Sequence, residues 1–314
     1  MNLCQPNYDL VTFILLTYNQ EQFVSDAVKG AFAQTYSRIQ FILSDDCSTD
    51  STFSIMEDLA ECYSTSKDVI VRQNKENLGI AAHLNEVMKI AKGDIIVIAA
   101  GDDISLPDRT RISVDILKKY KNATSVLLSS IELHGSSYES GSDRLRLGNH
   151  VELIQNRRSL SQWNYVTFGA SRVFRRSLFT VFGPLDKECP TEDTPLLLRS
   201  LILGDNILSS KKGIVYRIHE NNLSGLRSIS EMDMSKIYKQ YYSDLRFARN
   251  ENLIGSADYL SFRKWIVESR KVNLIKLKIR SGLKLSANDY RFIIRHKAFG
   301  SRFFVLLLCK KFLF

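Results

Sequence analysis

The sequence has few cysteines and no long hydrophobic run. Its five cysteines are odd in number and scattered, and no two form a Cys-x-x-Cys pair. This usage argues against a disulfide framework or a zinc site, and it predicts a reducing cytosolic environment. The opening segment MNLCQPNYDL is mostly polar, so we expect no signal peptide. Internal repeats and low-complexity tracts are also absent from the sequence.

Basic residues are concentrated in the C-terminal part of the chain. From Arg246 onward there are 16 Lys and Arg against 4 Asp and Glu, so the preceding residues are slightly acidic overall. The longest apolar run there, FFVLLLC, has seven residues, whereas a membrane span needs about 20. The segment 290–314 is interpreted as an interfacial amphipathic segment on anionic lipid, with a plain packed helix as the alternative. No nucleic-acid-binding module accompanies the charge, so we expect no nucleic-acid partner.

Apolar strands alternate with helical stripes over about the first 100 residues. We expect strands at 11–16, 39–44, 69–73 and 95–100, with helices at 21–33, from 48–50 onward, and at 81–91. This order predicts an α/β fold with a Rossmann-like, mainly parallel sheet flanked by helices. Ligands in such sheets bind beyond the carboxyl ends of the strands. One edge should therefore carry the polar segments Thr17–Asn19, Asp45–Asp46 and Asp102–Asp103.

Acidic pairs gathered on one edge raise each other's pKa unless a positive charge lies among them. A divalent cation is the simplest solution, and carboxylate oxygens favour Mg²⁺ or Mn²⁺ over zinc. Asp102 and Asp103 are the candidate ligands. For these two residues alone, the alternative is a solvated turn in which Asp103 caps a helix.

Four motifs occur in the chain in a fixed order: ILLTYNQEQFVSDAVKGAFAQTY, FILSDDCSTDST, ENLGIAAHLN and IAAGDDISLPDR. In their order and spacing they resemble the family 2 glycosyltransferases with the GT-A fold, and TEDTPLLLRSLILG and YRIHENNLSG extend the likeness more weakly. The resemblance implies a glycosyltransferase domain over 1–225, with a nucleotide-binding half (1–110) and an acceptor-binding half (111–225). A helical, basic, membrane-associating region is expected over 226–314.

The resemblance also implies the nucleotide-binding residues. Thr17, Tyr18 and Asn19 would touch the nucleotide, and Asp45 or, preferably, Asp46 would accept a hydrogen bond from the uracil or thymine imide. Gly79 would allow close backbone approach, and Asn85 would help to fix its segment. The alternative for Asp45 and Asp46 is an Asx-type turn that caps the next helix, a role expected of Ser48 and Asp50. His83 has either a diphosphate role or a buried structural one.

The catalytic residues follow from the same resemblance. Asp102 would lie near the ribose and Asp103 would hold the Mn²⁺ or Mg²⁺ ion that bridges the donor phosphates, while Gly101 stands where relatives often carry a third acid. His219 is the candidate further metal ligand or diphosphate partner, alongside Arg217. Glu192 and Asp193 match the family's Glu-Asp pair, with Asp193 as the general base. Their alternative role is in the first turn of a helix, where its dipole favours acidic residues.

These features predict an inverting, hexosyl-type glycosyltransferase that moves one sugar from a UDP- or dTDP-linked donor to a lipid-linked or surface-glycan acceptor. No QxxRW motif of processive members is present, so a single addition is favoured. The expected setting is bacterial lipopolysaccharide or capsule assembly, on the cytoplasmic face of the membrane. Two alternatives stay open: a non-catalytic nucleotide-binding relative and a sugar-nucleotide nucleotidyltransferase. The loop TYNQEQF lacks the glycines and basic residues that the latter uses to grip a triphosphate.

Overall fold

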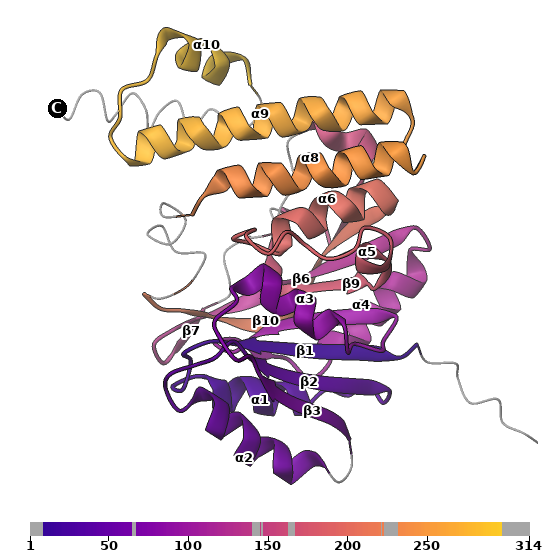
Figure 1. The fold of residues 1–314 in the computed structure, drawn as a ribbon, viewed down its shortest axis with the longest axis vertical. Helices are drawn as coiled ribbons and strands as arrows, with labels where there is room; N and C mark the ends of the chain where they lie inside the picture. The colour runs from indigo at the N-terminus through magenta and orange to yellow at the C-terminus, as the bar shows by residue number, and fades with distance from the viewer. Residues whose placement is uncertain are drawn as a thin grey trace, which may run out of the picture.

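A computed structural model describes residues 9–64, 67–139, 145, 147–162, 167–220, 222 and 232–296. These residues form a ten-stranded mixed sheet with helices on both faces (Figure 1). The sheet order is β3-β2-β1-β4-β9-β6-β10-β5, with β7 paired to β6 and β8 paired to β10. The strands are β1 Val11–Thr17, β2 Ile39–Asp45, β3 Asp68–Gln73, β4 Ile95–Ala100, β5 Ile104–Ser105, β6 Ala123–His134, β7 Ser137–Glu139, β8 Glu152–Gln155, β9 Arg172–Arg175 and β10 Asp205–Ile218.

The first four strands in the sheet order are parallel, as the sequence predicts. β1 pairs in parallel with β2 and β4, and β2 with β3, so their carboxyl ends lie at one edge. β9 lies antiparallel between β4 and β6 and divides this parallel unit from the parallel β6–β10 pair. The predicted α/β fold class is therefore confirmed, with antiparallel strands added in the second half of the chain.

Both faces of β1 are apolar, and this explains its unbroken hydrophobic sequence. Ile14 and Leu16 belong to the hydrophobic cluster on one face, whereas Phe13 and Leu15 belong to the cluster on the other. Successive side chains of a strand point to opposite faces, so a strand covered on both sides needs apolar residues at every position. The same logic applies to β4, whose residues also divide between the two clusters.

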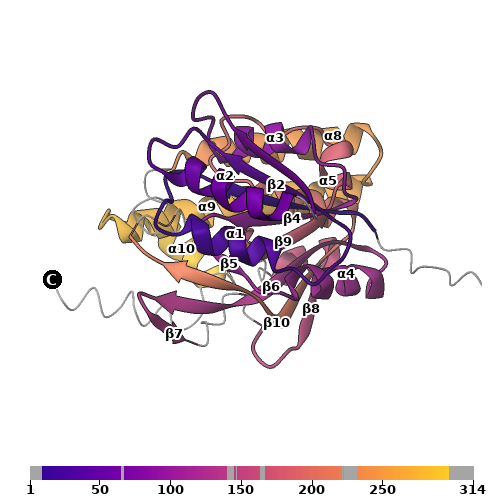
Figure 2. The same cartoon turned by 90° about the horizontal axis from the view of Figure 1, so that it is seen from below.

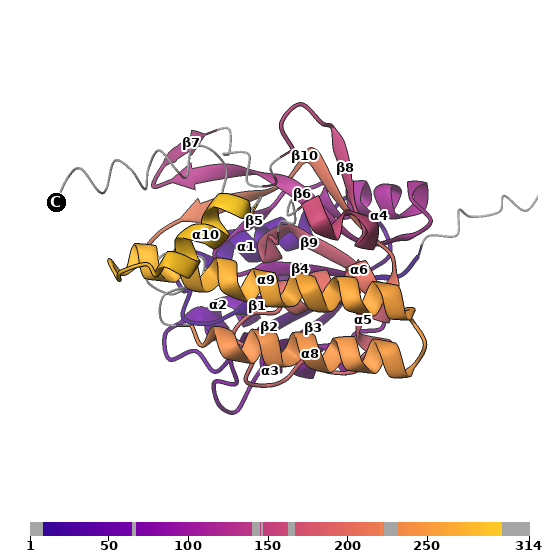
Figure 3. The ribbon, with the colours of Figure 1, turned by 90° about the horizontal axis from the view of Figure 1, so that it is seen from above.

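Helices cover each face in a separate layer (Figures 1 and 2). Residues of α1 Val24–Phe32, α2 Thr52–Ser64 and α4 Arg109–Lys119 belong to one hydrophobic cluster. The opposite cluster is built from α3 Ile80–Met88, α5 Ser177–Thr180, α6 Asp193–Leu203, α8 Met234–Asn250 and α9 Ser256–Arg280. α8 and α9 lie side by side above that face (Figure 3). The remaining helices are the 3-10 turns η1 Arg157–Gln162 and η2 Gly169–Ser171, and α10 Ala287–Arg295.

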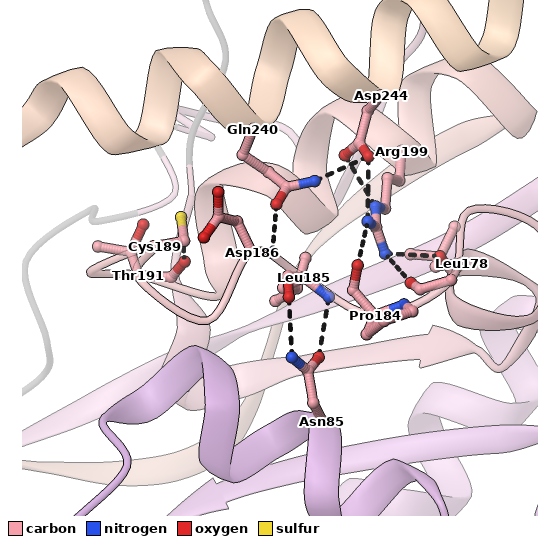
Figure 4. Close-up of polar contacts among 11 residues, drawn as sticks. Asn85, Leu178, Pro184, Leu185, Asp186, Cys189, Thr191, Arg199, Gln240 and Asp244 are labelled. Carbon is pink, nitrogen blue, oxygen red and sulfur yellow. Dashed lines mark hydrogen bonds and ion pairs between the residues drawn. The ribbon is translucent and has the colours of Figure 1, made fainter.

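A buried ion pair joins α8 to the sheet domain (Figure 4). The Arg199 guanidinium in α6 is fully buried and donates from Nε and Nη2 to the two carboxylate oxygens of Asp244 in α8, at 2.8 and 3.0 Å. Its remaining N–H groups reach the backbone carbonyls of Gly183, Leu178 and Pro184 at 2.8 to 3.3 Å. Because every donor of this buried cation is used, the pair fixes α8 in one position.

The C-terminal helices continue the same core. Ile237, Leu245, Phe262 and Ile266 are buried in the cluster that also holds the apolar side chains of α6. The predicted domain boundary at 225/226 lies outside the described residues, as does most of the predicted interfacial segment 290–314. Within the described part of the chain, none of the helices is both long and apolar enough to cross a membrane.

The Arg199–Asp244 pair gives a stability prediction. Asp244→Ala should lower the free energy of unfolding by about 3 to 5 kcal/mol, because it leaves a buried guanidinium without its counter-charge. The double variant Arg199→Met/Asp244→Leu should lose less than Asp244→Ala does. Chemical denaturation followed by circular dichroism measures both.

Glu86→Ala is the control, since the ion pair of Glu86 with Lys89 is exposed. This substitution should change the free energy of unfolding by less than about 1 kcal/mol. Equal losses in all three variants would contradict the assignment.

Candidate active site

Two loops at the carboxyl edge, one after β1 and one after β2, are interlocked. The backbone N–H of Asn19 donates to Ser48 Oγ at 2.8 Å, and Asn19 Oδ1 accepts from the Thr49 N–H at 2.9 Å. Asn19 has a left-handed φ of 51°, a conformation that Asn tolerates better than most residues. Tyr18 beside it is 43% exposed, so its ring is available to a ligand at this edge.

Asp45 is completely buried at the end of β2 and supports these loops. Its carboxylate accepts hydrogen bonds from the Thr17 hydroxyl, the Ser48 backbone and hydroxyl, and Gln73 Nε2, at 2.5 to 3.0 Å. These donors satisfy a carboxylate that would otherwise be costly to bury. Thr17, predicted to touch the nucleotide, is itself buried and bonded to Asp45.

Asp46 fixes the loop that precedes α3. Its Oδ1 accepts from Asn74 Nδ2 at 2.6 Å and the Leu78 N–H at 3.0 Å, and its Oδ2 accepts from the Gly79 N–H at 2.9 Å. Gly79 has a φ of 77°, which favours glycine, and open space lies where a Cβ would stand. The Cα of Gly79 therefore borders open space.

His83 is a buried structural residue in this arrangement. Its Nε2 lies 2.7 Å from Ser44 Oγ, which also accepts from the Arg72 guanidinium at 2.7 Å. Burial lowers the pKa of His83 to about 4, so the ring is neutral near pH 7. A neutral, buried ring favours the structural alternative over a diphosphate role.

The Asp102–Asp103 pair follows β4 on the same edge. Asp103 is buried, and its Oδ1 accepts from the Arg217 backbone N–H at 2.9 Å. Its Oδ2 is also buried and has no hydrogen-bond partner among the described residues. Burial, followed by the charge of Asp102, raises the pKa of Asp103 well above its usual range. The charges of Arg109 and Arg217 oppose this shift, but neither guanidinium donates a hydrogen bond to Oδ2.

Steric crowding explains why residue 101 is a glycine. A Cβ at this position would lie 2.4 Å from Gln20 Oε1 and 2.6 Å from Thr17 Cγ2. The close approach of the loop after β1 leaves no space for a side chain, so a third acid at position 101 would displace that loop.

Arg109 lies behind Asp103, at the start of α4. The guanidinium is buried and donates to Ser105 Oγ and to the carbonyls of Ile98 and Ala170, at 2.5 to 2.9 Å. Burial lowers the pKa of Arg109 to about 9, against the opposing effect of the Asp103 charge. Arg109 is thus hydrogen-bonded to the η2 turn and interacts with the Asp103 carboxylate through its charge.

His219 and Asn222 bind the other carboxylate of the pair. His219 Nε2 lies 3.0 Å from Asp102 Oδ2, and Asn222 Nδ2 donates to the same oxygen at 3.4 Å. The Arg217 guanidinium points instead to α1, where it donates to Asp26 at 3.0 Å and stacks on the Phe23 ring 4.7 Å away. In this structure Arg217 serves the site through its backbone N–H to Asp103.

These residues fit a divalent cation held mainly by carboxylate oxygen. The Oδ2 atom of Asp103, which has no hydrogen-bond partner among the described residues, is a hard oxygen ligand that a cation would satisfy. Asp102 precedes Asp103 in the sequence, and His219 is hydrogen-bonded to Asp102. No cluster of three or more His, Cys, Asp or Glu side chains with metal-site geometry occurs in the described ranges. The site matches the pattern in which one or two carboxylates and substrate phosphates share a Mg²⁺-like ion.

Glu192 and Asp193 form a second acidic site at the start of α6. Burial, followed by the charge of Asp193, raises the pKa of Glu192 to about 7. The η2 turn packs against it, since a Cβ on Gly169 would lie 2.4 Å from Glu192 Oε1. The next residue, Ala170, accepts the hydrogen bond from Arg109. The η2 turn therefore contacts Glu192 directly and the first acidic site only through Arg109.

Asn85 fixes the segment that leads to this acidic pair (Figure 4). Its Nδ2 donates to the Leu185 carbonyl and its Oδ1 accepts from the Leu185 N–H, both at 2.8 Å. The adjacent Asp186 N–H donates to Gln240 of α8, which also donates to Asp244. The hydrogen bonds of Asn85 thus hold the Leu185 segment, 100 residues away in the chain, against α3.

Sequence reasoning missed three polar residues that the fold brings to the site. Arg109 ends the motif IAAGDDISLPDR without having been assigned a role, Arg172 lies in no motif, and Asn222 lies in YRIHENNLSG, where Arg217 and His219 were singled out. Their signal is burial: each is at most 6% exposed, which is unusual for Arg and Asn.

Solved glycosyltransferase structures share this fold. S. aureus TarS in complex with UDP-GlcNAc superimposes with a TM-score of 0.62 over 82% of this chain and 71% of that chain, at 15% identity. The mannosyltransferase PcManGT from Pyrobaculum calidifontis, in complex with GDP-Man and Mn²⁺, gives a TM-score of 0.59 over 98% and 81%, at 17% identity. At these identities the likeness establishes the GT-A fold.

Proteins with similar sequences are also named as glycosyltransferases. EpsE of Bacillus subtilis, whose name assigns it to the glycosyltransferases, is 37% identical over 112 residues, which are 36% of this chain and 40% of EpsE. A Haemophilus influenzae protein named as a glycosyltransferase is 28% identical over 142 residues, 43% of each chain. The chain thus spans about two fifths of these relatives. The model for Glycosyl transferase family 2 matches residues 12–182, more than half of the sequence. The chain belongs to glycosyl transferase family 2.

Proposed function

We propose that the enzyme transfers one sugar, with inversion, from a UDP- or dTDP-linked donor to a lipid-linked or surface-glycan acceptor. The observation that carries the proposal is the buried, unpartnered Oδ2 of Asp103 at the carboxyl edge of a glycosyltransferase domain. TarS and PcManGT bind UDP-GlcNAc and GDP-Man in their solved complexes, which supports a nucleotide-diphosphate donor here.

The donor would lie along the edge formed by the first two loops. Tyr18 and the open backbone at Gly79 are accessible there, and Asp45 and Asp46 are held beside them by several donors. One oxygen of Asp46 or Asp45 would accept the imide N–H of the base, since a carboxylate oxygen has capacity for a further hydrogen bond. The bonds from Asp46 to Leu78 and Gly79 would couple base recognition to the position of that loop.

Asp103, with Asp102 and His219 beside it, would hold Mn²⁺ or Mg²⁺. When bound, the ion supplies positive charge that stabilises the departing diphosphate. The Arg217 N–H keeps the Asp103 carboxylate oriented, and the charge of Arg109 favours its ionised form. His219 and Asn222 hold Asp102 in place near the donor ribose.

Asp193 would take the proton of the acceptor hydroxyl as its oxygen attacks the anomeric carbon. The new glycosidic C–O bond forms while the bond from the anomeric carbon to the diphosphate breaks, and the nucleoside diphosphate leaves with that bonding pair. Attack from the face opposite the leaving group inverts the anomeric centre. Glu192, with a pKa near 7, lies next to the base and is suited to share its proton.

The enzyme would act on a membrane-bound acceptor by lying on an anionic membrane surface. α9 presents Leu260, Val267 and Leu274, which are 60%, 53% and 50% exposed and recur every seven residues, so they share one side of the helix. Exposed basic side chains lie between them: Arg263, Lys264 and Arg270. A second copy of the same helix would place like charges face to face, whereas anionic lipid matches both the apolar and the basic residues.

The geometry of the C-terminal helices agrees with this placement. α10, which follows α9, lies at the same end of the molecule as the carboxyl ends of the parallel strands (Figures 1 and 3). The acidic Asp258 of α9 is neutralised by Arg157 at 3.2 Å. We propose that the enzyme acts on the cytoplasmic face of the membrane, in surface-polysaccharide assembly.

Asp103→Asn tests the metal assignment. The variant should lose the Mn²⁺-dependent part of donor binding and roughly a hundredfold or more in kcat/KM, because the cation loses its principal anionic ligand. In EDTA its melting temperature should rise, since the substitution removes a buried carboxylate whose pKa is raised. Calorimetry and thermal melts measure these effects.

Asp108→Asn, in the same segment but half-buried, should behave like the parent. Donor binding and turnover at the parent's level in Asp103→Asn would refute the assignment.

Asp193→Asn tests the base. It should retain donor affinity and lose roughly 10² to 10⁴ in the rate of sugar transfer, because an amide accepts no proton. Donor titration and a transfer assay with Mn²⁺ separate the two effects. Glu188→Gln is a matched control, since that carboxylate is about half exposed and, among the described residues, forms its ion pairs with two lysines of α8. Retained transfer in Asp193→Asn would require another base.

The double variant Leu260→Glu/Val267→Glu tests the membrane surface. The parent should float with vesicles containing one third phosphatidylglycerol and stay behind with pure phosphatidylcholine. The variant should lose at least about tenfold in vesicle affinity, because it replaces inserted apolar groups with two charges of the lipid's own sign. Val151→Glu, at a position 64% exposed on another part of the surface, should float normally. Unchanged flotation of the double variant would exclude α9 as the contact.

A further inference from the structure

The guanidinium of Arg172 is fully buried, and two of its nitrogens have no hydrogen-bond partner among the described residues. It begins β9, is 0% exposed, and donates from Nη1 to Ser125 Oγ at 2.9 Å. Its Nε and Nη2 atoms are buried and have no hydrogen-bond partner in the described part of the chain. In Arg199 the same two nitrogens donate hydrogen bonds to the carboxylate of Asp244. The corresponding edge of Arg172 therefore has the donor geometry that a carboxylate accepts.

The acidic groups that act on Arg172 are Asp193 and Glu192. Burial lowers the pKa of Arg172, and the charges of Asp193 and then Glu192 oppose that effect. The other titratable groups around the pair are Tyr241 of α8, which interacts with Asp193, and Cys189, which interacts with both carboxyls. Burial raises the pKa of both, the thiol to about 11, so they are neutral near pH 7. Arg172 is thus the cation in this group of interacting residues.

We infer that Arg172 is a positioning residue that keeps the Glu192–Asp193 pair singly ionised, so that one carboxylate is free to accept the acceptor's proton. The inference rests on the proposed role of Asp193 as the base. Two adjacent carboxyls in a buried position favour taking up a proton, and a buried positive charge beside them opposes further protonation. Glu192, whose pKa is near 7, would hold the shared proton, and the Nε–Nη2 edge would stabilise the remaining charge.

The η2 turn gives this arrangement its geometry. Gly169 leaves room for Glu192, Ala170 accepts from Arg109, and Arg172 follows directly in β9. This short segment therefore lies between two buried arginines: it accepts a hydrogen bond from Arg109 of α4, which interacts with Asp103, and it carries Arg172, which interacts with Glu192 and Asp193.

The pH dependence of transfer tests the inference. In Arg172→Met the acid limb of the kcat profile should move up by about 1 to 3 pH units, because the pair loses its neighbouring positive charge and binds protons more tightly. Activity should recover to within a few fold of the parent at high pH, and Arg172→Lys should restore most of the acid limb. A purely structural role would instead lower kcat by the same factor at every pH. That result would overturn the inference.

Arg175→Met is the matched control. Arg175 lies in the same strand but donates to the Ala123 and Leu117 carbonyls, away from the acidic pair. It should leave the profile in place. Thermal melts of all three variants check that each is folded, and an equal shift in Arg175→Met would show that any loss of charge from β9 has the same effect.

A readout without substrate separates this inference from the proposed function. Carboxyl-¹³C NMR of the metal-free chain, with Glu192 assigned through Glu192→Gln, follows its titration directly. The midpoint should lie near 7 in the parent and move upward in Arg172→Met. A shift without any transferase activity would support the electrostatic role and refute the proposed reaction. An unshifted midpoint would overturn the inference even in an active enzyme.

Discussion

The site depends on burying carboxylates at the edge of a hydrophobic sheet. An ionised carboxylate in such a place is stable only with donors or positive charge beside it. Asp45 and Asp46 meet this requirement with backbone and side-chain donors from two neighbouring loops. Asp103 meets it only in part, with the Arg217 N–H and the nearby Arg109, and one oxygen is left over. The same constraint therefore separates carboxylates that hold the structure from one that is available for chemistry.

The second acidic site follows the same rule but depends on different elements. Glu192 and Asp193 start α6, whose Arg199 is bound to Asp244 in α8. Asn85 and Gln240 fix the preceding segment from opposite sides through Leu185 and Asp186. The C-terminal helices thus contribute to the placement of the candidate base as well as to the core, and the η2 turn contacts Glu192 on one side and Arg109 on the other.

Much of the fold was predictable because its signals are local. The runs at 11–16 and 95–100 read as strands buried on both faces, and β1 and β4 are buried along nearly their whole length. The prediction that the polar segments after β1, β2 and β4 lie at one edge of the sheet followed from strand direction alone. The antiparallel β9 was not anticipated, since RVFR is short and its place between β4 and β6 depends on pairing with residues far away in the chain.

The sequence by itself determined the α/β alternation, the order of the acidic motifs and the family, because these depend on local periodicity and spacing. Only the tertiary structure decided how each polar group is used. Asp46 and Asn85 bond to backbone groups more than 30 residues away or on another layer, and Gly101 is glycine because Thr17 and Gln20 close over it. The burial of Arg109 and Arg172 likewise depends on which elements pack around them, since side-chain chemistry alone predicts that arginine lies at the surface.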